Sequence, residues 1–315
     1  MSLLEVRDLK VSYTTRRGRI EALSGVSLAL GEGEVVGVVG ESGSGKSTLG
    51  QAILRLLPRY AHIEGGEVLF QGRNLLELEE DEMREIRGRE IAMVFQDPYS
   101  SLNPVMRIID HFSELYEEHG AGYTREEAAK LAGDILEKMG VPREKLLEYP
   151  HQMSGGQRQR VAIALGLALN PRLLIADEIT TALDALVEAQ IVDLLKEVRH
   201  TFKTSILFIT HNMGLVAQLA DKVTVMYAGK IVEFGNTRDV ISSPLHPYTK
   251  ALLASVPRIG GSKELQPIPG DPPDMRSPPP GCRFHPRCPL ATEKCRSEEP
   301  PLKLKGDRLV ACHYA

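Results

Sequence analysis

The chain has 315 residues, of which 42% are hydrophobic and 25% are charged. This composition is typical of a soluble globular protein with one large or two ordinary domains. The net charge is −4, and acids and bases are mixed along the chain, so nothing favours a dedicated nucleic-acid-binding protein with its basic face. The opening MSLLEVRDLK lacks the apolar region of a signal peptide, and the apolar run VAIALGLAL is too short to cross a bilayer. We therefore expect a cytosolic chain whose membrane role comes through partners.

The predicted elements alternate between strands and helices. The opening LLEVRDLKVSY alternates loosely and predicts an edge strand, and a helix is expected from Lys46 to about Leu57, where Pro58 follows. Three apolar runs predict buried strands: GEVVGVVG at 33–40, LLIAD at 173–177 and SILFIT at 205–210. Two charged segments, 124–140 and 144–150, have a helical pattern. This order predicts an α/β fold with a largely parallel sheet. No internal repeat is visible, so we expect one copy of the fold per chain.

The composition changes at Pro257. The stretch 257–281 holds eight of the 20 prolines of the chain, so it cannot form regular helix or central strand. We expect an extended linker or wrapping loop there, followed by a segment that contains every cysteine.

A phosphate-binding motif follows the first buried strand. GESGSGKST matches G-x-x-x-x-G-K-[ST], in which glycines let consecutive amides point at phosphate oxygens. Lys46 would pair with the β- and γ-phosphates, and Ser47 would bind Mg²⁺. An accidental glycine-rich turn is the alternative, but the strand before it and the helix after it favour the motif. The predicted ATP-binding residues here are Gly40, Glu41, Ser42, Gly43, Ser44, Gly45, Lys46, Ser47 and Thr48.

Two acids end the strand LLIADE. A carboxylate at a strand tip beside such a loop can hold Mg²⁺ or its waters, which is the role expected of Asp177. Glu178 would then orient and polarise the attacking water. Taken alone, this pair would more often be a solvated strand end.

The stretch MSGGQRQR at 153–160 predicts a second helix start. Ser154 is a suitable N-cap, and paired glycines let a phosphate approach the backbone near the positive end of the helix dipole. An ordinary N-cap is the alternative. Two phosphate-seeking helix starts more than 100 residues apart could face one nucleotide across a dimer.

These motifs, together with TALD and ITH, resemble in order and spacing an ABC transporter ATPase subunit over residues 1–256. The resemblance implies a P-loop NTPase (RecA-like) core with an antiparallel β edge subdomain and an inserted α-helical subdomain at about 97–160. It implies that Tyr13 stacks on adenine and that Gln96 touches Mg²⁺ and the attacking water. It also implies that His211 contacts the γ-phosphate, and that DPYSSLNP at 97–104 receives a permease coupling helix.

The resemblance divides the site between two subunits. The catalytic residues would be Glu178, His211, Lys46 and Gln96, and the Mg²⁺ ligands would be Ser47, Gln96 and Asp177. Five residues would act on the ATP of the neighbouring subunit: Ser154, Gly155, Gly156, Gln157 and Asp184. Ile179 departs from the usual proline and Met153 from the usual leucine. Neither change removes a polar catalytic group, but Ile179 would shift the backbone just after Glu178 and so affect hydrolysis more than binding.

The C-terminal region narrows the family. HPYTKALLASVP at 246–257 and PPGCRFHPRCPLA at 279–291 resemble the ATPase subunits of oligopeptide/dipeptide permeases. The resemblance implies an ATP-hydrolysing importer motor at the cytoplasmic face of the membrane, taking up di-/oligopeptides or a related solute such as oligosaccharides or nickel. Its partners would be two transmembrane permease subunits, a second similar ATPase or a copy of itself, and indirectly an extracytoplasmic solute-binding protein, with no nucleic acid.

Two other functions fit parts of the pattern. A soluble ABC ATPase of DNA repair would insert long coiled coils between the two phosphate motifs, and one of translation would carry two cassettes, whereas this chain has neither. A non-hydrolysing regulatory module would be expected to lack Lys46, Glu178 or His211, which are all present.

All four cysteines lie in the last 34 residues, with the spacing C-x5-C-x6-C-x16-C: Cys282, Cys288, Cys295 and Cys312. We predict that they bind one 4Fe–4S cluster in a loop-rich extension at 257–315, since a segment with few apolar residues needs a staple to fold. The alternatives are Zn²⁺, although its tight C-x2-4-C pairs are missing, and free or disulfide-bonded thiols, of which the disulfide is disfavoured in a reducing cytosol. The resemblance agrees with the cluster.

Overall fold

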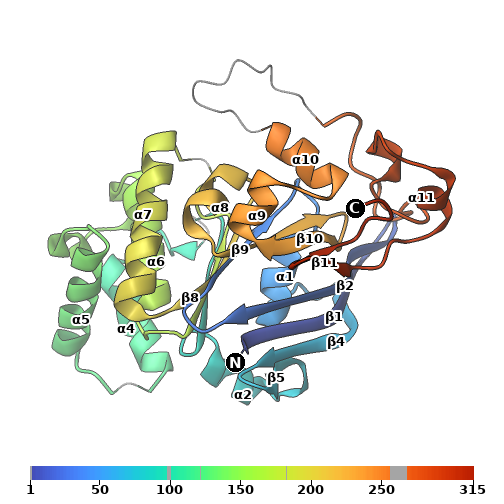
Figure 1. The fold of residues 1–315 in the computed structure, drawn as a ribbon. Helices are drawn as coiled ribbons and strands as arrows, with labels where there is room; N and C mark the ends of the chain where they lie inside the picture. Colours follow the sequence, from blue (N-terminus) through green and yellow to red (C-terminus); the bar gives the residue numbers. More distant parts are fainter. Residues whose placement is uncertain (1, 98–100, 121, 182, 256–267) are drawn as a thin grey trace. The chain divides into compact units, whose positions relative to one another are not determined.

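The computed structural model describes residues 2–97, 101–120, 122–181, 183–255 and 268–315. The chain divides into two compact units, Met1–Glu77 with Phe208–Ala315, and Leu78–Leu207. We call these the first unit and the second unit. Figure 1 shows their elements coloured along the sequence.

The first unit opens with an antiparallel sheet in the order β2-β1-β4-β5. Its strands are β1 Ser2–Thr15, β2 Gly18–Gly31, β4 Ala61–Phe70 and β5 Arg73–Asn74. Because β1 pairs with β2 on one side and β4 on the other, the expectation of an edge strand is wrong. The second neighbour, AHIEGGEVLF, carries two adjacent glycines and only two buried residues, so its sequence gives a weak strand signal.

A second sheet of the first unit carries the phosphate loop. β3 Val35–Val39 is buried at every residue and runs parallel to β9 Lys222–Tyr227. Beyond β9 the strands β10, β12 and β11 follow in antiparallel order, with bounds Lys230–Asn236, Arg308–Val310 and Lys303–Lys305. The C-terminal extension therefore supplies two strands to the sheet that carries the loop, and the buried strand predicted at 33–40 is confirmed.

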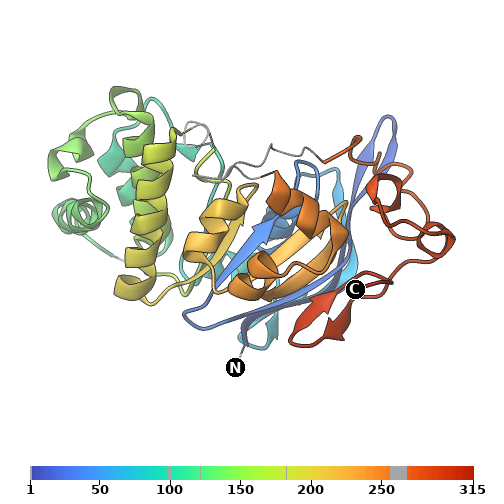
Figure 2. The same ribbon diagram turned by 45° about the horizontal axis from the view of Figure 1, so that its top comes forward.

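Short helices cover this sheet, as Figure 2 shows for the yellow and orange segments. α8 packs on β3, and α9 and α10 pack on β10. The closeness of α8 depends on Gly37, because a Cβ there would lie 2.6 Å from a methyl of Val216. The helices of this unit are α1 Lys46–Ile53, α8 Met213–Leu219, α9 Thr237–Ser242, α10 Pro247–Ala254 and α11 Glu293–Ser297, with 3-10 turns at Leu75–Glu77 and His285–Arg287.

The helix after the phosphate loop is shorter than predicted. It ends at Ile53 rather than Leu57, because Arg55 adopts a left-handed backbone with φ of 55°, which a right-handed helix cannot continue.

The second unit is mainly helical. Its strands β6 Ile91–Val94 and β7 Leu173–Asp177 pair in parallel. Its helices are α2 Glu80–Ile86, α4 Ile108–Glu118, α5 Arg125–Lys138, α6 Gly155–Leu167 and α7 Ala185–Phe202, with 3-10 turns at Arg143–Leu147 and Pro150–Gln152. The chain leaves this unit within β8 Ser205–Thr210.

The predicted strands at 173–177 and 205–210 are confirmed, and α5 confirms the helix predicted at 124–140. The segment predicted as a helix at 144–150 is helical only in a 3-10 turn at Arg143–Leu147 and does not continue to 150. Tyr149 is extended, with ψ of 155°, because the ring of Pro150 disfavours helical backbone in the residue before it.

The C-terminal extension lies beside the β1–β2 hairpin in both views, where it is drawn in red. The backbone of Glu21 in β2 donates a hydrogen bond to Met275 at 3.2 Å. Of the linker expected at 257–281, the part up to 267 lies outside the described residues, and from 268 to 281 the chain has no helix or strand. Over the described part of the chain, no helix combines the length and the apolar character needed to cross a membrane.

Candidate functional site

The phosphate loop lies between β3 and α1, the context that the sequence predicts. A Cβ at Gly40 would lie 2.2 Å from the carbonyl oxygen of Met226, and Gly43 and Gly45 have φ of 77° and 100°, so only glycine fits. The ammonium of Lys46 donates to the carbonyls of Gly40 at 2.9 Å and Glu41 at 3.1 Å. The loop thus curls around the Lys46 side chain, which is 3% exposed.

Tyr13 lies next to this loop. Its hydroxyl hydrogen-bonds the Thr48 hydroxyl at 2.9 Å, and its ring centroid is 5.8 Å from that of Tyr60. Tyr13, which is expected to stack on adenine, is therefore half-buried and contacts Thr48, the last residue of the phosphate loop. His211 follows β8 directly and is exposed, and Asn212 caps α8 through its side chain.

The acidic pair ends β7 in the second unit. Asp177 is 3% exposed, and Glu178 is half-buried with a left-handed backbone, φ 47°. Thr181 donates its hydroxyl to the Glu178 carboxylate at 3.3 Å. A non-glycine residue held at positive φ is a form of local strain found often at functional sites. Ile179, which replaces a proline of the resembled family, is buried at 1% exposure.

Gln96 lies two residues beyond β6 and is exposed. The segment proposed to receive a permease helix, 97–104, follows it, and its residues 98–100 lie outside the described residues.

Ser154 begins α6, and its hydroxyl accepts the amide of Gln157 at 3.2 Å while Gln157 accepts the amide of Ser154 at 3.1 Å. This is a complete capping box, so the predicted capped helix start is confirmed. A Cβ at Gly155 would meet no atom closer than 3.8 Å. Among the described residues, no contact therefore requires glycine at this position.

The start of α7 lies beside that helix start. Asp184 caps α7 by accepting the amides of Leu186 and Val187 at 3.1 and 3.0 Å. A Cβ at Gly156 would lie 3.0 Å from a methyl of Val187. The structure therefore brings the SGGQ and TALD motifs of the second unit together.

The predicted ATP-site residues fall into two groups, each within one unit. The first unit holds Tyr13, the loop at 40–48 and His211, and the second holds Gln96, Ser154–Gln157, Asp177, Glu178 and Asp184.

The four cysteines line one cavity of the first unit. None of them forms a disulfide. Three sulfurs accept the backbone amide two residues further on: Cys282 from Phe284, Cys288 from Leu290, and Cys312 from Tyr314. The Cys295 sulfur lies 3.6 Å from the Thr292 hydroxyl. Every sulfur thus has a polar group directed at it, as thiolate ligands of metal centres require.

Burial, with a smaller contribution from the other three cysteines, raises the pKa of the Cys282 thiol to about 11, against a lowering by the hydrogen bond from the Phe284 backbone. Burial also raises the pKa of Cys288, with Cys312 and Cys295 adding to the rise. The main physical cause is that burial disfavours the charged thiolate, and repulsion between neighbouring thiolates adds to it. Among the residues that the structure describes, no three His, Cys, Asp or Glu side chains are grouped to hold a metal ion.

The sequence did not reveal the contacts of Glu41. Its carboxylate pairs with Arg287 and its amide donates to the Tyr248 hydroxyl at 2.9 Å. Both partners belong to the two C-terminal motifs, HPYTKALLASVP and PPGCRFHPRCPLA, and both lie more than 200 residues away. In the sequence, only the presence of these two C-terminal motifs could have pointed to Tyr248 and Arg287.

Comparisons with known proteins agree with this reading. Residues 23–181 match the ABC transporter family model, and residues 232–295 match the model of the oligopeptide/dipeptide transporter C-terminal region. The chain belongs to the ABC transporter ATP-binding proteins of the oligopeptide/dipeptide family. As such it is an ABC-type ATPase that drives transport.

Relatives match this ABC ATP-binding protein over nearly its whole length. It is 45% identical over 99% of the chain to a dipeptide transport ATP-binding protein, DppD, of Caldanaerobacter subterraneus subsp. tengcongensis, and covers 96% of that protein. It is 47% identical over 95% of the chain to the oligopeptide transport ATP-binding protein OppD of Bacillus subtilis, covering 85% of it.

A solved structure supports the fold. A dimeric ATP-binding cassette in a post-hydrolysis state, bound to ADP and Pi, matches with a TM-score of 0.67 and 30% identity, over 75% of this chain and 99% of that one. The predicted P-loop α/β fold, with its antiparallel β subdomain and helical subdomain, is confirmed.

Proposed function

We propose that the chain hydrolyses ATP to ADP and phosphate to drive the uptake of di- or oligopeptides. The observation that carries this proposal is the match of residues 232–295 to the oligopeptide/dipeptide transporter C-terminal region, in a chain with a full set of ATPase motifs. The names of the relatives, dipeptide and oligopeptide transport ATP-binding proteins, point the same way. Oligosaccharides and nickel are the alternative solutes, because the ATPase motifs do not contact the solute.

The partners follow from this role. The chain would bind two transmembrane permease subunits at the cytoplasmic face of the membrane, with residues 97–104 receiving a permease helix. It would pair with a second, similar ATPase or with itself, and depend indirectly on an extracytoplasmic solute-binding protein. The cassette would span residues 1–256, with a helical subdomain at about 97–160 and the extension at 257–315.

Within the cassette, Lys46 and the amides of residues 40–48 would hold the phosphates, and Tyr13 would stack on adenine. Ser47, Gln96 and Asp177 would bind Mg²⁺, which neutralises charge between the β- and γ-oxygens when it is present. The left-handed backbone of Glu178 and its bond to Thr181 support a fixed carboxylate, which would orient water in line with the γ-phosphate. His211 would stabilise the charge that develops there.

The SGGQ segment would act on the ATP of the neighbouring subunit. Its 13-residue helix has its own cap, and Gly155 leaves the backbone open to approach from outside. Ser154, Gly155, Gly156 and Gln157, with Asp184 beside them, would then complete a site that the chain alone lacks.

The four cysteines would hold a 4Fe–4S cluster. Four cysteines also suit Zn²⁺, but zinc sites usually use tight C-x2-4-C pairs, which this spacing lacks. A 4Fe–4S cluster is held by four cysteine thiolates, and all four cysteines line the same cavity. Its positive iron ions would also offset the repulsion that raises the pKa of Cys282. Zn²⁺ remains the alternative.

Anaerobic purification followed by iron, sulfide and zinc analysis tests this assignment. We expect about four irons and four sulfides per chain. Stoichiometric zinc without sulfide would contradict the cluster.

Reconstitution with the permease tests the transport role. We expect ATPase activity of the assembled transporter to rise when a peptide-loaded binding protein is added. Stimulation by an oligosaccharide or nickel, and not by peptides, would contradict the solute. Association of the purified chain with DNA or ribosomes instead of permease would contradict the importer.

A further inference from the structure

The cysteine segment 282–288 is joined directly to the phosphate loop. Arg287 forms a two-pronged ion pair with Glu41, the second residue of the loop, with nitrogen–oxygen distances of 2.6 and 3.0 Å. The Arg287 side chain is 5% exposed and that of Glu41 is 24% exposed. Such bidentate, largely buried pairs are directional and stronger than surface ion pairs.

Other groups fix the guanidinium of Arg287 in place. Its Nε donates to the carbonyl of Pro269 at 2.8 Å, and Nη1 donates to the Tyr227 hydroxyl at 3.3 Å. The guanidinium carbon also lies 5.8 Å from the centroid of the Tyr227 ring. Arg287 therefore presents a fixed fork to Glu41 instead of following it.

The backbone of Glu41 is held as well. Its amide donates to the Tyr248 hydroxyl at 2.9 Å. Its carbonyl accepts the amide of Ser44 at 3.2 Å and the ammonium of Lys46 at 3.1 Å. Glu41 thus links the C-terminal motifs to the lysine expected to bind phosphate.

An aromatic cluster supports the same contacts. The ring centroids of Tyr227 and Tyr248 are 4.6 Å apart, and that of Phe284 lies 5.2 Å from Tyr227 and 5.4 Å from Tyr248. Phe284 belongs to the cysteine segment and is 2% exposed. The segment therefore packs against the residues that position Glu41 and Arg287.

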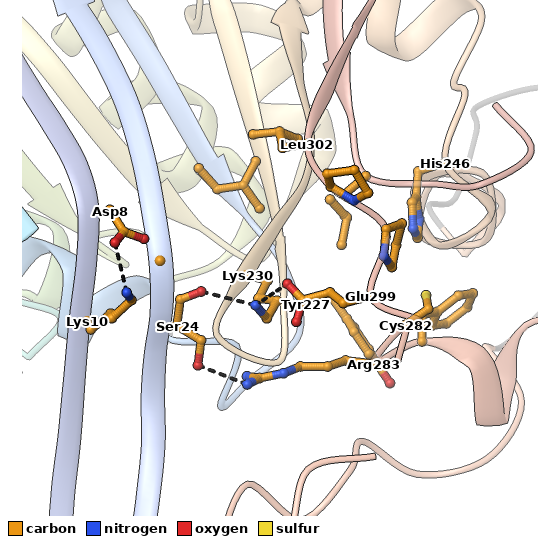
Figure 3. A pocket seen from close by; sticks show the side chains of 17 residues that line it. Asp8, Lys10, Ser24, Tyr227, Lys230, His246, Cys282, Arg283, Glu299 and Leu302 are labelled. Carbon is orange, nitrogen blue, oxygen red and sulfur yellow. Dashed lines mark hydrogen bonds and ion pairs between the residues drawn. The ribbon is translucent and has the colours of Figure 1, made fainter. Parts of the chain in front are cut away.

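The other end of the segment is anchored by Arg283, next to Cys282. Arg283 donates to the Ala228 carbonyl, and to Glu21 and Ser24 at 2.9 Å. Figure 3 shows Arg283 directed at Ser24 on the wall of a cavity of about 340 Å³. Gly229, the neighbour of Ala228, donates its amide to the carbonyl of Ser44 at 3.0 Å. Arg287, next to Cys288, therefore contacts the phosphate loop directly. Arg283, next to Cys282, contacts the residue that precedes Gly229, which itself contacts the loop.

We propose that Arg287 is a positioning residue for the phosphate loop and that the four-cysteine site holds it there, which couples the integrity of that site to ATP affinity. An unpaired Glu41 carboxylate in a loop that binds a polyanion would repel the ligand. Arg287 removes that repulsion and fixes the loop backbone. The inference rests on the proposed function in that the loop binds ATP and the cysteines bind a cluster.

A double-variant cycle on the full chain, purified anaerobically, tests the ion pair. The affinity for a fluorescent ATP analogue is measured for Arg287→Gln, Glu41→Gln and the double variant. We expect Arg287→Gln to weaken binding about tenfold, or about 1.4 kcal/mol, and the added Glu41→Gln to restore most of it because no bare carboxylate remains. A merely structural role of Arg287 would lower the thermal unfolding temperature together with the affinity, whereas a positioning role weakens ATP binding in a chain that stays folded.

The matched control is Arg276→Gln, which removes an arginine of the same extension that pairs with Asp274 two residues away. We expect its affinity to equal that of the wild type. Wild-type affinity in Arg287→Gln, or a double variant as weak as Arg287→Gln, would overturn the proposal. Thermal unfolding and iron content of each variant establish that it is folded and loaded.

Cys288→Ser tests the link to the cysteine site without changing either charge. We expect weaker ATP binding, and no further loss when Arg287→Gln is added, because both changes release the same brace. Additive losses would overturn the link. The ATP affinity and turnover of the wild type test the proposed ATPase independently, and its iron, sulfide and zinc content tests the cluster independently.

Discussion

The helices α1 and α6 both begin with a glycine-rich motif that is predicted to bind phosphate, but their first turns are stabilised differently. α1 begins after Gly45, which has a left-handed backbone and no capping side chain. α6 begins after Ser154, which forms a complete capping box with Gln157. The shape of the first motif comes from groups around it, including Lys46 within the loop and Arg287 from the extension. The second motif has its own capping box, which suits the proposed action on the ATP of a neighbouring subunit.

The two helix starts also show which features could be predicted from the sequence and which could not. Local features were predictable: the buried strand before the phosphate loop, the cap at Ser154 and the glycines of the loop follow from neighbouring residues. The support of the loop was not, because Glu41 and Arg287 are 246 positions apart and neither has a local signal. The same limit explains the error at β1, whose second neighbour β4 is rich in exposed residues and glycine. All four cysteines line one cavity, whereas their binding of a 4Fe–4S cluster stays a prediction.

The largest expected effect comes from a substitution that stops ATP hydrolysis without altering the start of α1 or α6. Glu178→Gln removes the carboxylate proposed to orient water while leaving both helix starts unchanged. We expect turnover to fall by about a hundredfold or more, with ATP binding retained and a closed dimer trapped. Steady-state ATPase assays and size-exclusion chromatography with ATP measure this. Near-normal turnover would remove Glu178 from the role.

A smaller effect sharpens the difference between a cap and a functional residue. Ser154 and Thr124 both cap helices of the second unit with capping boxes. Ser154→Ala and Thr124→Ala should each lower the free energy of unfolding by about 1 kcal/mol. Only Ser154→Ala should also lower ATPase activity severalfold. Urea unfolding and turnover are measured on both; equal activities would mean that Ser154 is only a cap.

The smallest effect concerns Gly155, which has room for a methyl group within the chain. Gly155→Ala should raise the free energy of unfolding by about 0.5 kcal/mol, because alanine loses less backbone entropy than glycine. It should lower ATPase activity at the same time, since the added methyl stands where the neighbour's phosphate approaches. A variant that is both more stable and fully active would show that the open glycine has no such role.

The most direct test of the central claim is to mix two inactive chains. Lys46→Ala lacks the lysine that would bind phosphate but keeps the start of α6 intact. Ser154→Arg keeps the phosphate loop intact but places a bulky side chain at the start of α6. The ATPase activity of each variant and of the mixture is measured at a protein concentration at which the wild-type chain alone hydrolyses ATP. If each α6 acts on its neighbour's nucleotide, the mixed pair contains one intact composite site, and the mixture recovers activity that neither variant has alone. A mixture as inactive as its components would contradict the account.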